Sequence, residues 1–487
     1  MSGVWLLLPV LLPMAGGLPL FKMQNKNLRR YYTLVLLTLE TALFFLLSGG
    51  VEGGQPLFAL GSDLVLRLRC DGVGRLFGTV VCVLWLVVSV YAFDYIDHER
   101  NRGRFFGFYV VSLGALIGIC SAGNLITLYL FYELMTLLTV PLVIHNQEKR
   151  SVAAGVKYLG FSVFGAGLSL FSLFFLKNYW ADDLFRGGGI LDPAAAAGHE
   201  GLLLVLYLLL MIGFGAKAGM FPLFTWLPAA HPVAPSPASA VLSGLITKMG
   251  VLAILRVTWF VYGPAFLVGT WAQKTALGLA IFTVFIGSML ALKEKVIKRR
   301  LAFSTVSQVS YILFGIFLLD GTALQGALLQ FVFHAVAKNA LFLSAGALIL
   351  TTGHTRVDQL RGVGRIAPVT LWGFALGALS LVGIPPTGGF VSKWYLAQGA
   401  LKSGLGGLSY VGLAVLMISA LLTAGYLLPT VIRGFFPGGD EQPELVCPVS
   451  RGMNGVILAL GVTVVTLGLF PGLLDKLLAP ALAAALG

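Results

Sequence analysis

Charge, cysteine and cofactor motifs are all scarce in this chain. Charged residues make up 11% of the sequence, whereas hydrophobic residues make up 57%. The four cysteines have no paired spacing of the kind that holds zinc or an iron–sulfur cluster. There is also no Walker loop and no dinucleotide-binding fingerprint after a strand. We therefore expect no cofactor, no metal site, and neither ATP-driven transport nor redox chemistry within this chain.

Long apolar stretches, in contrast, recur from one end of the chain to the other. Each is long enough to cross the hydrocarbon core of a bilayer as a helix. The pattern predicts an all-α polytopic membrane protein with about 14 transmembrane helices. The longest polar stretches, around residues 182–200 and 434–451, leave no room for a soluble domain.

Lysine and arginine are concentrated in the odd-numbered loops between these spans, for example in residues 100–104 and 293–300. The positive-inside rule then places the odd-numbered loops in the cytoplasm and both termini on the outer side of the cell membrane. The net charge of +13 mostly reflects this bias. Because the basic residues are scattered over short loops, we expect no nucleic-acid partner.

Five ionisable residues interrupt the apolar stretches: Glu133, Lys217, Lys248, His334 and Lys393. A charge at the bilayer centre costs about 3 kcal/mol on insertion scales, so such residues usually mark an ion or proton path. Burial makes a lysine release its proton more readily, and a nearby carboxylate opposes that release. Histidine can pass a proton in either direction. Together the five residues predict a proton or cation relay.

Three further residues are secondary candidates: His231, Arg256 and Lys338. Lys338 lies one helical turn after His334, and Arg256 lies two turns after Lys248. Each candidate also has a structural alternative. Arg256 is nearer a helix end and could anchor there, and Lys393 precedes an aromatic pair that could form an interfacial belt.

Two of the predicted spans are interrupted by proline and glycine. Lys217 precedes Pro222, and Lys393 follows Pro385 and Pro386. Proline removes an intrahelical hydrogen bond, and unwound backbone at membrane depth is tolerated only in a protein-lined or water-lined cavity. The breaks lie five spans apart, as two inverted five-helix repeats would place them. The expected organisation is helices 1–3 in residues 1–104, helices 4–8 in 105–262, helices 9–13 in 263–433 and helix 14 in 434–487.

Six segments carry a recognisable series of motifs in a fixed order. They are residues 124–134 with Glu133, 217–231 with Trp226-Leu-Pro-Ala-Ala-His231, 234–248, 298–308, 334–338 and 383–393. This series resembles the antiporter-like membrane subunits of respiratory complex I, of Mrp-type sodium/proton antiporters and of membrane-bound hydrogenases. The resemblance spans most of the chain. It departs from the family at Phe224, Ala229 and Val296, where many relatives carry polar or acidic residues.

The resemblance implies 14 helices with two inverted repeats, ion translocation as the activity, and other membrane subunits as partners. It assigns Glu133 and Lys217 as the coupled pair of a first half-channel and Lys248 as the bridge to the middle. His334 would be the relay of the second half, and Lys393 its terminal lysine.

Three functions remain open from the sequence. The chain could be a proton-translocating subunit of a redox-driven complex, a subunit of an Mrp-type sodium/proton antiporter without a redox partner, or a membrane scaffold with a vestigial relay. The chain ends soon after its fourteenth span and retains Lys393. Within the resemblance, the first feature favours an Mrp D-type subunit, an inner complex I subunit or a hydrogenase subunit, and Lys393 favours the Mrp and hydrogenase group. Whether sodium moves, and what supplies the energy, stay undetermined.

Overall fold

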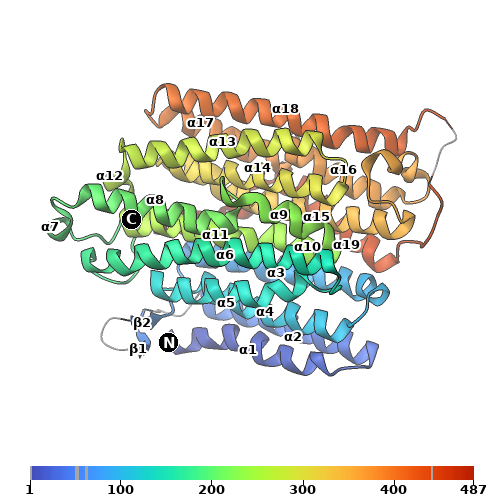
Figure 1. Ribbon diagram of the computed structural model, residues 1–487, viewed down its shortest axis with the longest axis horizontal. Coiled ribbons are helices and arrows are strands. Elements are labelled where there is room, and N and C mark those ends of the chain that lie inside the picture. Colours follow the sequence, from blue (N-terminus) through green and yellow to red (C-terminus); the bar gives the residue numbers. More distant parts are fainter. Residues whose placement is uncertain (1–2, 50–53, 61–63, 440–442) are drawn as a thin grey trace.

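The computed structural model describes residues 3–49, 54–60, 64–439 and 443–487. Long helices lie roughly parallel to one another and make up nearly all of the fold (Figure 1). Within the described residues, 13 helices are long and apolar enough to span a membrane. Two shorter helices, α16 (Pro368–Val382) and α17 (Gly388–Lys402), together provide a fourteenth crossing. The expected all-α polytopic architecture is thereby confirmed.

The remaining elements follow one another as short connections and long spans. In chain order they are α1 (Leu8–Gly17), α2 (Lys26–Ser48), β1 (Pro56–Leu60), β2 (Leu64–Arg67), α3 (Gly72–Tyr95), α4 (Arg102–Cys120), α5 (Leu125–Val143), α6 (Lys149–Leu176), α7 (Pro193–Ala196), α8 (Glu200–Ala218), α9 (Leu227–Val233), α10 (Ser236–Val241), α11 (Thr247–Leu255), α12 (Pro264–Leu267), α13 (Trp271–Lys293), α14 (Ile297–Phe317), α15 (Gly321–Thr352), α18 (Gly407–Phe435), α19 (Arg451–Leu469) and α20 (Asp475–Leu486).

The two ends of the bundle carry different connections. The β1–β2 hairpin, α7, α12 and both ends of the chain lie together at one end (Figure 1). We call this the hairpin end. The opposite end, which we call the basic end, holds the odd-numbered loops that are rich in lysine and arginine, such as residues 96–101 between α3 and α4.

Both expected helix breaks are present. Helix α8 ends at Ala218, and Gly219 follows with φ 79°, a left-handed conformation that glycine adopts without strain. The chain then passes Pro222 and a 3₁₀ turn (Leu223–Trp226) before α9 begins. Helix α16 likewise ends before Gly383, which has φ 90°, and α17 begins after Pro385 and Pro386.

Helix packing follows a similar order in the two halves. In the first half α4 packs on α5, α5 on α6, α6 on α8, and α8 on α11. In the second half α13 packs on α14, α14 on α15, α15 on α16, and α16 on α18. Helix α15, with 32 residues, also contacts α10 and the π-helical segment Leu242–Ile246. It therefore joins the two halves at the centre of the bundle.

Two elements differ from the sequence-based expectation. The sequence predicted an all-α fold, but β1 and β2 pair as antiparallel strands. The last segment was expected to form helix 14 alone, but it forms α19 and then α20. With 12 residues, α20 is too short to span a bilayer. It packs against α3 instead.

A buried ion pair joins the start of α3 to the first half. Asp71 accepts a hydrogen bond from the Gly74 backbone (2.9 Å) and contacts two Arg256 nitrogens at 2.5 and 2.7 Å. The Arg256 guanidinium also lies over the rings of Phe185 and Phe260. Burial, the largest single influence, raises the pKa of the Asp71 carboxyl. The charge and hydrogen bonds of Arg256, with smaller contributions from the Gly74 backbone and Arg69, together outweigh burial and lower this pKa below its ordinary value.

We expect Asp71→Asn to lower the free energy of unfolding by about 3 kcal/mol, because it leaves a buried guanidinium unpaired. Thermal unfolding in detergent measures this loss.

A carboxyl with a lowered pKa stabilises the fold above its unfolded pKa of about 4, and this stabilisation is lost as pH falls through the folded pKa. Wild type should therefore lose more stability than the variant on acidification below about pH 4. Asp182→Asn, which breaks an exposed pair with Arg186, is the control and should stay within about 1 kcal/mol of wild type. Equal losses in the two variants would contradict the assignment.

A second substitution tests the break between α16 and α17. A Cβ atom added at Gly389 would lie 1.8 Å from the Ser380 carbonyl oxygen, so the two helices would have to separate. We expect Gly389→Ala to cost about 1–3 kcal/mol of stability. Gly167→Ala, in α6, meets no atom within 4 Å and should be neutral or slightly stabilising. A tolerated Gly389→Ala would show that the break is not tightly packed.

Candidate functional site

Lys217 is enclosed by hydroxyl groups from two neighbouring helices. Its ammonium nitrogen donates to Thr136 Oγ1 (2.8 Å) on α5, and to Tyr158 OH (3.0 Å) and Ser162 Oγ (2.9 Å) on α6. The same nitrogen lies 4.3 Å from the centre of the Tyr158 ring. Lys217 is fully buried. Its positive charge is thus held by neutral oxygen atoms and an aromatic face.

The first helix break positions this lysine. Lys217 lies in the last turn of α8, where a cation is favoured by the helix dipole. Trp226, in the 3₁₀ turn after the break, donates to the Ala216 carbonyl at 2.7 Å, and its ring packs 4.5 Å from Tyr158. The turn after the break therefore closes over the lysine.

Glu133 does not form an ion pair with Lys217 in this structure. It lies on α5, one turn before Thr136, and its Oε1 atom is buried with no hydrogen-bond partner among the described residues. The two groups still interact through space, since each charge influences the other. The expected coupled pair is therefore near but not in contact.

Two further lysines are held by backbone carbonyls at the centre of the bundle. Lys248 donates to the Ser243 carbonyl and to Thr247 Oγ1 (3.3 Å), directly after the π-helical segment. Such π-helical turns are frequent at functional sites. Lys338, on α15, donates to the Leu301 carbonyl of α14 at 2.9 Å. The charges of these two fully buried lysines repel each other.

The two central histidines have no hydrogen-bond partner among the described residues. Both ring nitrogens of His231 and of His334 are buried and unpaired. The His231 ring stacks on Phe342 at 4.6 Å, and Lys338 Nζ lies 6.0 Å from the same Phe342 ring. His334 lies within electrostatic range of Lys248, Lys338 and Lys393. Buried unpaired imidazoles of this kind require water or a transferable proton.

Lys393 occupies the second break. Its ammonium nitrogen donates to the Val382 carbonyl at 2.7 Å and to the Leu381 carbonyl, both at the end of α16. These carbonyls have no partner further along α16 because the helix ends there. The ring of Tyr311 lies 5.4 Å away. The aromatic pair after Lys393 does not hold its ammonium group at an interface, because that group points into the break.

Several polar residues around the second break were not singled out from the sequence. Gln330 donates to Gln308 Oε1 (3.0 Å), Ser392 donates to Gln330 Oε1 (2.6 Å), and Gln308 donates to the same Leu381 carbonyl as Lys393. A glutamine inside an apolar span is a detectable signal, since it needs a partner in the membrane. Further residues missed in this way are Lys298, Glu40, Ser288, Ser307 and Ser419.

The structure thus separates the candidates into groups. Lys217 lies with hydroxyls of α5 and α6, and His231, Lys248, His334 and Lys338 lie on the central helices. Arg256 is instead bound to Asp71. Among the described residues, no carboxylate lies within ion-pair distance of Lys217, Lys248, Lys338 or Lys393. Each of these ammonium groups instead donates hydrogen bonds to neutral oxygens.

Comparison with known sequences gives consistent matches. The family model described as NADH:quinone oxidoreductase/Mrp antiporter, TM, matches residues 122–423. The chain is 33% identical over 435 residues to the NADH-quinone oxidoreductase subunit N of Desulforudis audaxviator, covering 86% of this chain and 84% of that relative. It is 27% identical over 466 residues to the D-type subunit of the Na(+)/H(+) antiporter of Bacillus subtilis, covering 93% and 90%.

A solved structure gives the same fold. A chain of the Mrp complex from Dietzia sp. DQ12-45-1b superposes with a TM-score of 0.83 at 22% identity, covering 99% of this chain and 97% of that one. The family match covers more than half of the sequence and includes both helix breaks. The chain is therefore a multi-pass membrane protein that belongs to the NADH:quinone oxidoreductase/Mrp antiporter transmembrane family.

Proposed function

We propose that this chain translocates protons along Glu133, Lys217, Lys248, His334 and Lys393, with His231 and Lys338 as secondary members. One observation carries the proposal: lysines and histidines without carboxylate partners extend from the first helix break to the second. All of them are buried except Lys393 at the second break, which is half-buried. A cation inside the membrane without a carboxylate partner costs free energy, so a role in packing alone does not explain its presence. Arg256 is left out because Asp71 already neutralises it.

The hydrogen-bond partners suit proton transfer. Neutral hydroxyl and carbonyl oxygens stabilise an ammonium group less than a carboxylate does, so the lysine can lose its proton. The hydroxyls around Lys217 can both donate and accept, and Tyr158 is further bonded to Thr139 Oγ1 at 2.7 Å. A shift of Glu133 toward Lys217 would favour the charged lysine, and a shift away would favour release.

The proposed organisation places one broken helix in each repeat. Residues 105–262 would form the first repeat, 263–433 the second, 1–104 the preceding helices and 434–487 the closing segment. The matching order of helix packing in the two halves supports this division. The concentration of basic residues at one end supports a cytoplasmic basic end and termini outside the cell membrane.

The relatives support two energy sources. The Desulforudis audaxviator relative, named as part of an NADH-quinone oxidoreductase, supports a subunit of a redox-driven membrane complex, which we take as the first candidate. The Bacillus subtilis relative, named as part of an Na(+)/H(+) antiporter, supports an Mrp-type sodium/proton antiporter as the second. In both cases the partners are other membrane subunits. Mass spectrometry of what co-purifies in mild detergent, with sodium-dependent proton exchange in vesicles, distinguishes the two.

We expect Lys217→Ala to reduce proton transport by at least about tenfold without loss of assembly, because the hydroxyl cage loses the group that carries the proton. A pH-sensitive dye in vesicles containing the intact complex measures transport, and size-exclusion chromatography checks assembly. Lys402→Ala is the control, since Lys402 is exposed and its ammonium group donates to Thr322 Oγ1 at 3.3 Å, far from the relay residues in the sequence. Full transport by Lys217→Ala would contradict the proposed role of Lys217 and favour the membrane-scaffold function.

Glu133 has a buried oxygen without a hydrogen-bond partner among the described residues, which favours the neutral carboxyl when Glu133 is away from Lys217. A hydrophobic carbodiimide reacts with protonated carboxyls from within the membrane. We therefore expect it to label Glu133, which is only partly buried, and to inhibit transport in proportion. The internal control is Glu40, whose unpaired carboxyl is fully buried and should stay unlabelled. Peptide mapping measures both sites, and labelling that survives in Glu133→Gln would contradict the assignment.

A further inference from the structure

An open polar pocket of about 800 Å³ lies at the basic end, away from the relay. It is formed by the segment before α2 and the first turn of α2, the connection from α3 to α4, the first turn of α4, and the connection from α5 to α6. Four arginines line it, accompanied by one carboxylate, Glu99. The arginines are Arg29, Arg100, Arg102 and Arg104.

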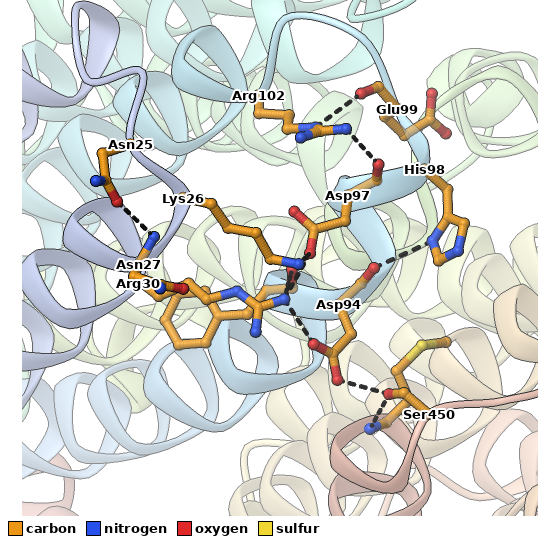
Figure 2. A network of polar contacts seen from close by, with 12 residues as sticks. Asn25, Lys26, Asn27, Arg30, Asp94, Asp97, His98, Glu99, Arg102 and Ser450 are labelled. Atoms are coloured by element: carbon orange, nitrogen blue, oxygen red, sulfur yellow. Dashed lines mark hydrogen bonds and ion pairs between the residues drawn. The ribbon is translucent and has the colours of Figure 1, made fainter.

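The neighbouring carboxylates are already occupied by other cations. Lys26 and Arg30 both contact Asp97 Oδ2 at 2.6 Å, and Arg30 also contacts Asp94 Oδ1 at 2.7 Å (Figure 2). The second oxygen of Asp94 accepts from Ser450 at 2.6 Å. These two acids therefore pair directly with Lys26 and Arg30. Asp97 attracts the pocket residue Arg29 only through space, without an ion pair.

The pocket arginines are bonded only to neutral backbone carbonyls in the described part of the chain. Arg29 is 4% exposed, donates to the Met23 carbonyl at 3.2 Å, and has an unpaired, buried Nε. Arg104 donates to the His145 carbonyl, and its Nε is also buried and unpaired. Arg102 donates to the carbonyls of Asp97 and Glu99 (Figure 2). Their positive charges thus lack a counter-ion.

Glu99 does not supply that counter-ion. No ion pair to its carboxylate is present among the described residues, and the strongest attractive charge acting on it is the buried Lys298, which lies outside the pocket. Burial raises the pKa of the Glu99 carboxyl, which makes this group easier to neutralise. The pocket therefore keeps an excess of positive charge.

A buried guanidinium without an anion is costly, and its planar fork of donors matches a phosphate group. The spans of α2 and α4 begin at Lys26 and Arg102, so Arg29 and Arg104 lie in the first turn, where lipid phosphates lie. The N-terminus of α4 adds its dipole, and its cap residue Asn101 makes no side-chain cap bond.

We propose that this pocket binds the phosphate group of an anionic phospholipid drawn from the surrounding bilayer. The shared chemistry is a phosphate held by guanidinium groups at the basic end. The position at the level of the lipid headgroups favours a lipid over a free phosphate. The site is independent of the proton relay, since none of its residues belongs to it.

The test uses the delipidated full chain in detergent and native mass spectrometry. Phosphatidylglycerol, phosphatidylcholine and inorganic phosphate are added separately. We expect one phosphatidylglycerol to bind preferentially, and the Arg100→Gln/Arg104→Gln double variant to bind it roughly tenfold more weakly. Arg186→Gln, an exposed arginine paired with Asp182 at the hairpin end, is the matched control and should bind as wild type does.

Arg29→Gln is a further variant that should also weaken phosphatidylglycerol binding, and its elution profile checks that it folds. If Arg29→Gln does not fold, the double variant still tests the proposal, since Arg100 is exposed. Equal lipid binding by wild type and the double variant would overturn the proposal. Binding of inorganic phosphate without phosphatidylglycerol would overturn the lipid as its source. Equal binding of phosphatidylcholine and phosphatidylglycerol would overturn the selectivity for an anionic lipid.

Discussion

The lysines within the spanning segments of this protein are held by neutral oxygen atoms. A helix break and the neighbouring helices provide these oxygens. An ammonium group inside an apolar bundle requires hydrogen-bond acceptors, yet backbone carbonyls within a regular helix are already used. The break after α16 provides free carbonyls for Lys393. Hydroxyls from α5 and α6 do the same for Lys217. The breaks and the cations therefore stabilise each other.

This arrangement differs in kind from the ion pairs elsewhere in the molecule. Asp71 and Arg256 neutralise each other and tie α3 to the first half. Lys26, Arg30, Asp94 and Asp97 form a compact charged network at the basic end (Figure 2). Full pairing fixes a charge in place, whereas neutral acceptors leave a proton free to exchange. Among the candidates for the relay, the carboxylates thus separate Arg256, which is paired, from Lys217, Lys248, Lys338 and Lys393, which are held by neutral oxygens.

Much of the fold could be predicted from the sequence because its determinants are local. A run of apolar residues specifies a span through its own length, and the glycines beside Pro222 and Pro385 add to the tendency of proline to interrupt a helix. Proline alone is not sufficient, since Pro141 and Pro429 lie within the continuous helices α5 and α18. The pairing of Pro56–Leu60 with Leu64–Arg67 escaped prediction because the strands have only five and four residues, and so short a segment carries little signal for its partner. Helix α20 escaped because a short apolar segment carries no signal for the surface on which it packs.

The sequence by itself determined the membrane class, the positions of both breaks and the identity of the buried ionisable residues, since each follows from composition within one segment. Only the tertiary structure decided their partners. Lys248 and Arg256 are close along the chain, yet one is held by neutral oxygens while the other pairs with Asp71. Lys217 gains its acceptors from helices that precede it by many residues. Such contacts depend on how separate helices pack, which no local pattern encodes.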